Sequence, residues 1–260
     1  MRNLTEIIDI KAYPLADMAF RKACKSKLDS AGVLTMPGFL EAGALGELVA
    51  EAQQLEPNAF FRPERHNVYL RAKDPSYADD HPRNRLVSSS KGCVCDDEVP
   101  VNSHLRSLYG SELFKEFLCD VLGEQALHPY ADPLSSINIH YARAGEELGW
   151  HFDNSSFAVT LMLQAPEAGG AFEYVPGVRD ADAGEMNFAA VADVLDDKEE
   201  PKQLSMPAGT LVLFRGRNAL HRVAPVEGRI TRMLVVLAYN SEPGIALSES
   251  AHETFYGRLQ

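Results

Sequence analysis

A histidine and an aspartate two residues apart stand at the head of an apolar stretch, in the sequence WHFDNSSFAVTLML at 150–163. Residues two apart on a β-strand point to the same face, so the side chains of His151 and Asp153 would project together. Burying a charged group without a partner costs free energy. The pair is therefore either a satisfied polar contact at a strand end or part of a site that needs both groups.

A second histidine could complete such a site. In the sequence LFRGRNALHRV, His221 follows an apolar strand and a turn. Two histidines and one carboxylate form the facial triad that holds Fe(II) and leaves coordination positions open. Arg232 comes shortly afterwards, and if residues 218–226 and 230–240 form a hairpin it points into the same barrel. There its guanidinium could bind a dicarboxylate through two parallel hydrogen bonds.

The elements that must position these residues are short strands separated by Gly, Pro and Asn. The pattern predicts strands at 135–142, 150–153, 157–165, 171–175, 202–206, 210–215, 218–226 and 230–240. Such spacing is typical of a β-sandwich or barrel rather than of βαβ units. We expect a mainly β fold with flanking helices, whose core is a double-stranded β-helix (a jelly roll, cupin-like).

The N-terminal half reads differently. Apolar spacing and helix-forming residues predict helices at 16–32, 41–55 and 111–123, and a further helix is expected within 184–197. Residues 57–110 look irregular and polar, which suggests a lid or binding loop. We expect a single domain over 1–260, with helical support and a lid-like region in 1–130, the jelly roll in 131–245 and a C-terminal tail in 246–260.

Composition narrows the function classes. The net charge of −12 shows no basic footprint for nucleic acid, and no apolar run approaches a membrane span. The N-terminus lacks the pattern of a secretory signal, so a cytoplasmic protein is expected. Cys93 and Cys95 form a lone C-x-C pair without a matching ligand pair. We interpret them as reduced thiols, with zinc ligation as the lesser alternative.

Several blocks in order resemble the Fe(II)/2-oxoglutarate-dependent oxygenases. YARAGEELGWHFDN is similar to the Tyr-to-HxD block of the prolyl-hydroxylase branch, and GGAFEYVP to its Gly-Gly strand. GTLVLF resembles the strand before the distal histidine, and HRVAPVEGRITRMLVVLAY the final His-to-Arg block. The resemblance spans about 135–240, and GVLTMPGFL near 32 resembles the family's first strand.

The resemblance implies the roles of several residues. Iron would be held by His151, Asp153 and His221, and Arg232 would bind the distal carboxylate of 2-oxoglutarate. Thr231 and Tyr141 are weaker candidates for hydrogen bonds to that cosubstrate. Arg229 is the rival for the carboxylate. His140, beside Tyr141, is assigned to packing because only one of two adjacent strand residues faces inward.

Size and C-terminal sequence most resemble the free-standing amino-acid halogenase and hydroxylase group (BesD/HalD-like). Halogenases of that group carry Gly where this chain has Asp153, and the carboxylate fills the position that a halide would take. The resemblance thus implies hydroxylation of a free amino acid or similar small metabolite. The reaction would consume O2 and convert 2-oxoglutarate to succinate. A homodimer is a possible assembly.

An amino-acid substrate needs a cation for its carboxylate and an acceptor for its ammonium. The polar segment 83–91 (RNRLVSSSK) offers Arg85 first and Arg83 second, while Asn154 and Asn240 could line the pocket. Asp132 could pair with the ammonium. Taken singly, each of these residues is more often a surface arginine or a turn residue than a ligand-binding group.

Three alternatives stay open. The same ferryl chemistry could give desaturation, cyclisation or halogenation, because the pose of the substrate decides the outcome. A metal-binding cupin without oxygenase activity would serve as a sensor, although it would not need Arg232. An oxygenase that modifies proteins or nucleic acids is the third, and the acidic charge weighs against nucleic acid.

Overall fold

A computed structural model of the protein describes residues 3–259. Its helices are α1 (Met18–Ala31), α2 (Ala42–Leu55), α3 (His104–Tyr109), α4 (Glu112–Leu122), α5 (Phe188–Leu195) and α6 (Glu249–Tyr256), with short 3₁₀ turns at Leu4–Glu6, Glu56–Asn58 and Asp96–Glu98. Its strands are β1 (Val33–Met36), β2 (Phe60–Phe61), β3 (Glu64–Asn67), β4 (Leu86–Ser89), β5 (Gly92–Val94), β6 (Ile137–Ala142), β7 (Leu148–His151), β8 (Ala158–Gln164), β9 (Ala168–Gly169), β10 (Phe172–Val175), β11 (Lys202–Leu204), β12 (Leu211–Phe214), β13 (Leu220–Val223), β14 (Val226–Glu227) and β15 (Arg232–Leu237).

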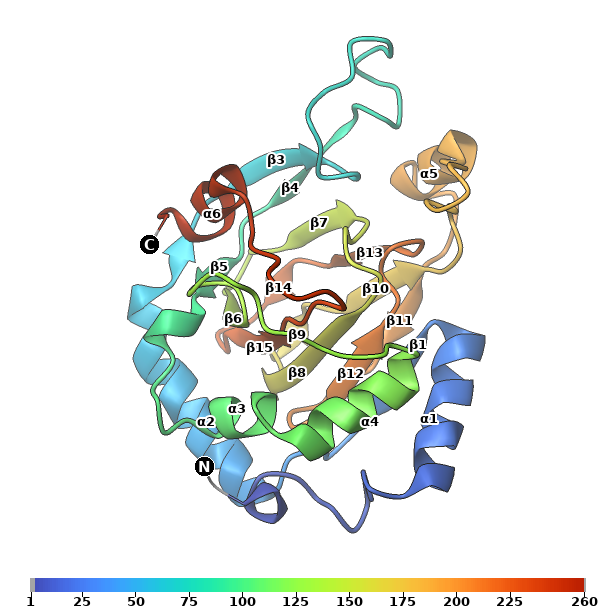
Figure 1. Cartoon of the computed structure of the whole chain (residues 1–260). Coiled ribbons are helices and arrows are strands. Elements are labelled where there is room, and N and C mark those ends of the chain that lie inside the picture. The colour runs from blue at the N-terminus through green and yellow to red at the C-terminus, as the bar shows by residue number, and fades with distance from the viewer. Residues whose placement is uncertain (1–2, 260) are drawn as a thin grey trace.

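The strands form two antiparallel sheets that face each other. The larger sheet has seven strands in the order β1-β12-β8-β15-β6-β5-β2, and the smaller has six in the order β11-β10-β13-β7-β4-β3. A two-stranded ribbon of β14 and β9 lies beside them. The two sheets form the expected jelly roll with helices around it (Figure 1). Because β1 to β5 join the sheets, the β core reaches beyond the predicted range 131–245.

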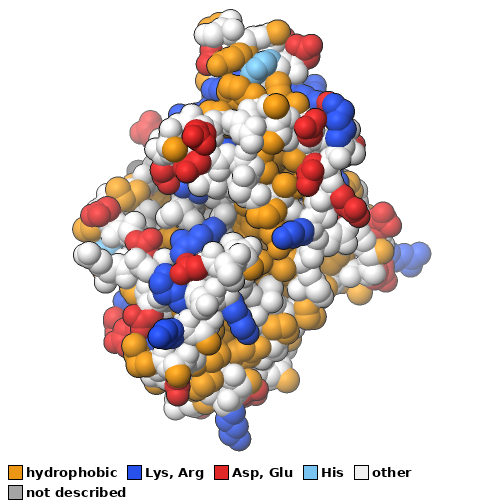
Figure 2. All heavy atoms as spheres, turned by 90° about the vertical axis from the view of Figure 1, so that its right-hand side faces the viewer, with side chains coloured by type: hydrophobic (Ala, Val, Ile, Leu, Met, Phe, Trp, Pro, Cys, Tyr) orange, Lys and Arg blue, Asp and Glu red, His pale blue; other side chains and the backbone are white. Residues whose placement is uncertain are grey.

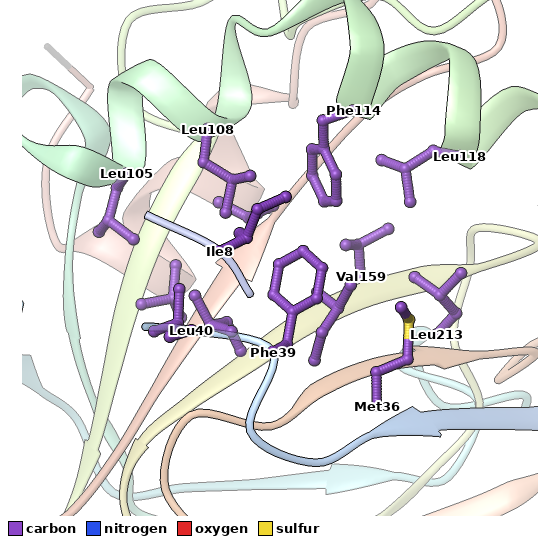
Figure 3. Packing of buried hydrophobic residues seen from close by; sticks show 14 of the residues in the cluster. Ile8, Met36, Phe39, Leu40, Leu105, Leu108, Phe114, Leu118, Val159 and Leu213 are labelled. Carbon is purple, nitrogen blue, oxygen red and sulfur yellow. The ribbon is translucent and has the colours of Figure 1, made fainter. Parts of the chain in front are cut away.

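The main hydrophobic core lies between the seven-stranded sheet and helices α1 to α4. Alternate residues of β6, β8, β12 and β15 project into it, as do the apolar stripes of the helices. Figure 3 shows Phe39 and Phe114 packed between α3, α4 and the sheet, with Val159 and Leu213 beside Phe39. Because the helices cover it, the outer face of the larger sheet is part of a close-packed protein interior.

The six-stranded sheet has a smaller core on its outer face. Tyr69, Trp150 and Phe152 pack there with α5. Residues 68–85, which contain no helix or strand, extend from β3 and return into β4, and they form the protruding segment beside α5 in Figure 1. The predicted irregular region 57–110 is therefore shorter, because β2 to β5 and α3 occupy much of it. The predicted tail 246–260 contains helix α6.

Several predicted elements are confirmed, and their ends show why. Asp17 accepts a hydrogen bond from the Phe20 amide at the start of α1, and Gly32 ends that helix in the left-handed region at φ 71°. Ser111 and Gly123 delimit α4 in the same way. The signals that predicted these helices are local caps, so no tertiary contact was needed to find them.

One predicted pairing is wrong. Residues 218–226 and 230–240 do not form a hairpin, because β13 pairs with β7 and β10 in the smaller sheet while β15 pairs with β6 and β8 in the larger one. The turn between them crosses from one sheet to the other. This crossing places His221 and Arg232 on opposite walls of the barrel rather than side by side.

Acidic and basic side chains are interspersed on the face shown in Figure 2, where no continuous basic patch is seen. Over residues 3–259, no helix combines the length and apolarity that a membrane crossing requires.

Candidate metal centre

Two histidines from adjacent strands form the base of the site. His151, the last residue of β7, lies directly opposite His221 of β13, and their ring centroids are 4.1 Å apart. The Nδ1 atom of His151 lies 2.8 Å from the Gly149 carbonyl oxygen, and that of His221 lies 3.0 Å from the Ala219 carbonyl oxygen. A proton on each Nδ1 would satisfy these carbonyls and leave both Nε2 atoms free to bind a metal.

Asp153 supplies the third group. It follows β7 rather than belonging to it, and its backbone amide donates to the Gly216 carbonyl oxygen at 3.2 Å. Its Oδ1 lies 3.9 Å from His151 Nε2 and 3.5 Å from His221 Nε2. The three ligand atoms lie within 4.8 Å of one another. Two imidazoles and one carboxylate in this arrangement fit a facial-triad iron site.

Gly216 makes room for this carboxylate. A Cβ atom built on Gly216 would lie 1.8 Å from Asp153 Oδ2 and 3.0 Å from His221 Cε1. The Oδ2 atom is buried and has no hydrogen-bond partner among the described residues. A buried carboxylate oxygen without a hydrogen-bond partner, close to two imidazole Nε2 atoms, is consistent with a cation site.

The protonation states suit metal binding. Burial lowers the pKa of His151 to about 3, and the proximity of His221 acts in the same direction. Burial alone would raise the pKa of Asp153, but interactions with His221, and to a smaller extent with His151 and Arg179, outweigh it and lower that pKa. Near neutral pH His151 is therefore neutral and Asp153 is ionised, which are the forms that coordinate a metal.

Arg232 lies on the opposite wall, at the start of β15. Its side chain is buried, and its Nε and Nη2 atoms have no hydrogen-bond partner among the described residues. Burial lowers its pKa to about 10, so it stays a cation at neutral pH. Gly170 leaves room beside this side chain, because a Cβ atom at that position would lie 3.3 Å from Arg232 Cδ. A buried guanidinium without a carboxylate fits a site for an anionic group of a ligand.

The rival arginine lies elsewhere. Arg229 is exposed, and its backbone amide donates to a Glu167 carboxylate oxygen. It lies on the surface at the turn before β15. Thr231 also precedes β15, and its carbonyl oxygen accepts a hydrogen bond from Gln164 Nε2 at 2.9 Å. Strand alternation directs the Thr231 side chain away from the face of Arg232.

The expected orientation of β6 is wrong. Tyr141 lies in the core between sheet and helices, and its hydroxyl donates to the Ala52 carbonyl oxygen at 2.8 Å. His140, assigned to packing from the sequence, instead faces the barrel interior and pairs with Leu234 and Cys93 across the strands. Both faces of β6 are buried, so its sequence did not distinguish them.

A cavity of about 310 Å³ opens from the two metal-facing residues His151 and Asp153 and is bounded by both sheets and α6. Asn154 lines it as expected. Arg62, Glu64, Lys91 and His140 also line it, and the sequence did not predict any of them as site residues. Lys91 ends the polar segment 83–91 in which a carboxylate-binding cation was expected.

The other predicted substrate residues lie outside this cavity lining. Arg85 pairs with Asp196 and donates to the Leu195 carbonyl oxygen at 2.7 Å, which ties the protruding segment to the end of α5. Arg83 donates to the Ala72 carbonyl oxygen at 3.2 Å, within that segment.

Asp132 and Asn240 stabilise loops instead. Asp132 accepts hydrogen bonds from the backbone amides of Leu134 and Leu247, at 3.0 Å each. The backbone of Asn240 forms an isolated antiparallel β-bridge with that of His128. Neither Asp132 nor Asn240 is placed to bind a ligand in the cavity.

Comparison with known proteins agrees with this geometry. Residues 17–257 match the family model described as halogenase D. No curated protein matches the chain. Among solved structures, the epimerase SnoN from nogalamycin biosynthesis aligns with a TM-score of 0.60 at 15% identity, over 86% of this chain and 84% of that one.

Two bacterial structures give similar alignments. An oxidoreductase of the 2OG-Fe(II) oxygenase family from Burkholderia pseudomallei has a TM-score of 0.53 at 16% identity, covering 86% of this chain and 92% of its own. A Pseudomonas putida prolyl-4-hydroxylase has a TM-score of 0.52 at 14% identity, and the alignment covers 83% of this chain and 96% of that one. At these identities the likeness establishes a shared fold.

Proposed function

The chain belongs to the halogenase D family, and on that premise we propose that it is an Fe(II)- and 2-oxoglutarate-dependent hydroxylase of a free amino acid or similar small metabolite. The observation that carries the proposal is the pairing of two unsatisfied groups across one barrel. His151, Asp153 and His221 converge on one wall, and on the other wall Nε and Nη2 of the buried Arg232 have no hydrogen-bond partner within residues 3–259.

Each side chain has a distinct task in this proposal. The two imidazoles and the carboxylate hold Fe(II), while Arg232 fixes the distal carboxylate of 2-oxoglutarate and so orients the cosubstrate toward the metal. The bound iron and cosubstrate supply the oxidation of a C–H bond, coupled to decarboxylation of 2-oxoglutarate to succinate. The aromatic rings of Phe172 and Phe214, which contact His221 at centroid distances of 5.6 and 4.9 Å, exclude water from that side.

Asp153 supports hydroxylation rather than halogenation. Its carboxylate occupies the position at which a halide would bind, and Gly216 provides the space that it fills. Desaturation or cyclisation would use the same residues. The solved structures that share the fold include an epimerase and a carbocyclase, so the fold alone does not select among these outcomes.

The test is an anaerobic titration of the protein with Fe(II) and 2-oxoglutarate. We expect the weak visible charge-transfer band of chelated 2-oxoglutarate in the wild type and its reduction in Asp153→Ala and Arg232→Ala. Arg222→Ala is the matched control, because this arginine pairs with Glu173 and stacks on Trp150 at the smaller core. Absence of the band in the wild type, or an undiminished band in both site variants, would overturn the proposal.

A further inference from the structure

Two oppositely charged side chains line the cavity without belonging to the metal centre. Lys91 lies just before β5, and its Nζ is 3.3 Å from His140 Nε2. Because Cys93 pairs with His140, strand alternation directs Lys91 to the same interior face. Glu64 begins β3 in the smaller sheet, paired with Ser89, and lines the same cavity.

Neither side chain has an ion-pair partner among the described residues. Within residues 3–259, no ion pair within 4.0 Å joins Lys91 or Glu64 to another charged side chain. Burial lowers the pKa of Lys91, whereas the nearby Cys93 and Glu64 act against that shift. Burial also lowers the pKa of His140, so its neutral ring can accept a hydrogen bond from the Lys91 ammonium.

The other charged residues of the lining are already engaged. Arg62 donates to the Glu253 carbonyl oxygen at 3.2 Å, and Asp153 belongs to the metal group. Lys91, in the link from β4 to β5, and Glu64, on β3, are then the cation and the carboxylate that face this common space without an ion-pair partner among the described residues. Partly buried charges without partners are costly, and a ligand that carries both complementary charges would offset that cost at both ends.

The remaining lining is largely apolar. It includes Leu70, Leu148, Phe157 and Val236. The cavity of about 310 Å³ matches a small molecule and is far too small for a folded partner. A ligand with one apolar arm and two charged groups on neighbouring atoms satisfies the walls and both charges together.

Resting on the proposed oxygenase function, we propose that Lys91 binds the carboxylate and Glu64 the ammonium of a free α-amino acid whose side chain is apolar. His140 is a positioning residue that holds the Lys91 ammonium through its Nε2. Recognition of both charges would select free amino acids over amides and amines, which lack the carboxylate, and over peptides, whose ammonium and carboxylate lie on different residues.

The experiment measures binding by calorimetry to the anaerobic protein loaded with Fe(II) and 2-oxoglutarate. The probes are leucine, isoleucine, valine, methionine and phenylalanine, each with its primary amide and its N-acetyl derivative. We expect at least one free amino acid to bind, and its amide and N-acetyl forms to bind about tenfold or more weakly, as loss of a charged hydrogen bond implies. The charge-transfer band, recorded in the same samples, reports the cosubstrate separately.

Two variants assign the charges. Lys91→Met should remove the preference for the acid over the amide, and Glu64→Gln the preference for the free amine over the N-acetyl form. Both should keep the affinity for 2-oxoglutarate. Lys73→Met and Glu227→Gln are the matched controls, since Lys73 pairs with Asp79 in the protruding segment and Glu227 is exposed on β14.

Several outcomes would overturn the inference. These are equal binding of acids and amides by the wild type, no binding by any free amino acid, or a Lys91→Met variant that loses 2-oxoglutarate instead of the amino acid. If the charge-transfer band forms normally while these results are found, the oxygenase assignment stands and only the zwitterion site is wrong. If the band is absent, the oxygenase assignment itself fails.

Discussion

The two sheets face one cavity but are supported differently. The seven-stranded sheet, which carries Arg232, packs against α1 to α4 over the largest hydrophobic core. The six-stranded sheet, which carries His151 and His221, is backed by a smaller cluster and by the segment 68–85 with α5. The large core holds the strand that carries Arg232, while the sheet with the two histidines continues into the irregular segment 68–85.

The difference separates two tasks. The proposed cosubstrate anchor, Arg232, lies on the sheet that packs against the largest core, and the proposed substrate-binding charges lie near the edges of the sheets. Loops and edges tolerate change because fewer contacts hold them. Variants on the two walls should therefore fail in different ways.

Loss of a metal ligand should produce the largest effect. His221→Ala removes one of three donors from the smaller sheet, and we expect Fe(II) affinity to fall by more than about 100-fold, since even changes around metal ligands cost 10- to 100-fold. Metal titration by calorimetry measures this. His128→Ala, a half-buried histidine outside the metal group, should bind Fe(II) as the wild type does.

A variant of the larger sheet should leave the metal and lose the cosubstrate. Arg232→Met removes a charge-assisted contact worth about 1.5–3 kcal/mol, so the dissociation constant of 2-oxoglutarate should rise about 10- to 100-fold. Because the guanidinium is buried without a partner, the ligand-free variant should be at least as stable as the wild type. Denaturant unfolding without ligand checks the second point, and a clear loss of stability there would contradict it.

Acid should destabilise the metal-free protein through the smaller sheet. Folding holds the pKa of His151 at about 3, below the value of about 6.5 for an unfolded histidine. Between these values the unfolded chain binds the extra proton, so the free energy of unfolding falls as pH drops from about 6.5 toward 3. Urea unfolding across this range, compared between wild type and His151→Gln in the presence of a chelator, isolates this contribution. Parallel pH profiles for the two proteins would show that His151 does not contribute.

The smallest effect is expected at the outer end of the smaller sheet. Arg85 pairs with Asp196, and both side chains are more than a third exposed. Arg85→Ala should therefore lower global stability by no more than about 1 kcal/mol, yet speed amide exchange in 68–85. Hydrogen exchange measures both the global stability and the local exchange rates in 68–85. Lys73→Ala, which breaks a pair internal to that segment, is the control, and a stability loss above about 2 kcal/mol in Arg85→Ala would contradict this account.

The group of His151, Asp153 and His221 could be found from the sequence through short spacing and family resemblance, whereas the role of Arg232 stays a prediction. His151 and Asp153 are two residues apart at the end of an apolar strand, and His221 and Arg232 each accompany a strong strand. The jelly roll and the helix ends followed from turn and cap residues, which act within a few positions.

The substrate-facing charges could not be found in this way. Lys91 and Glu64 meet only because β5 joins one sheet and β3 the other, within a region that reads as a loop. Tyr141 and His140 were exchanged because both faces of β6 are buried, so apolar character does not reveal which residue faces the barrel. Pairing between distant strands decides these questions, and local sequence does not contain it.

The contact between Gly216 and the Asp153 carboxylate also constrains the order in which the site can evolve. While the carboxylate is present, any side chain at 216 would overlap it, so selection should hold that glycine fixed. Exchange of Asp153 for a glycine would remove the closer contact and leave only the one of 3.0 Å to His221 Cε1, which a small shift could relieve. Once a side chain has entered there, the route back to a carboxylate is closed until 216 reverts, which makes the change of ligand set a one-way step in the history of such a protein.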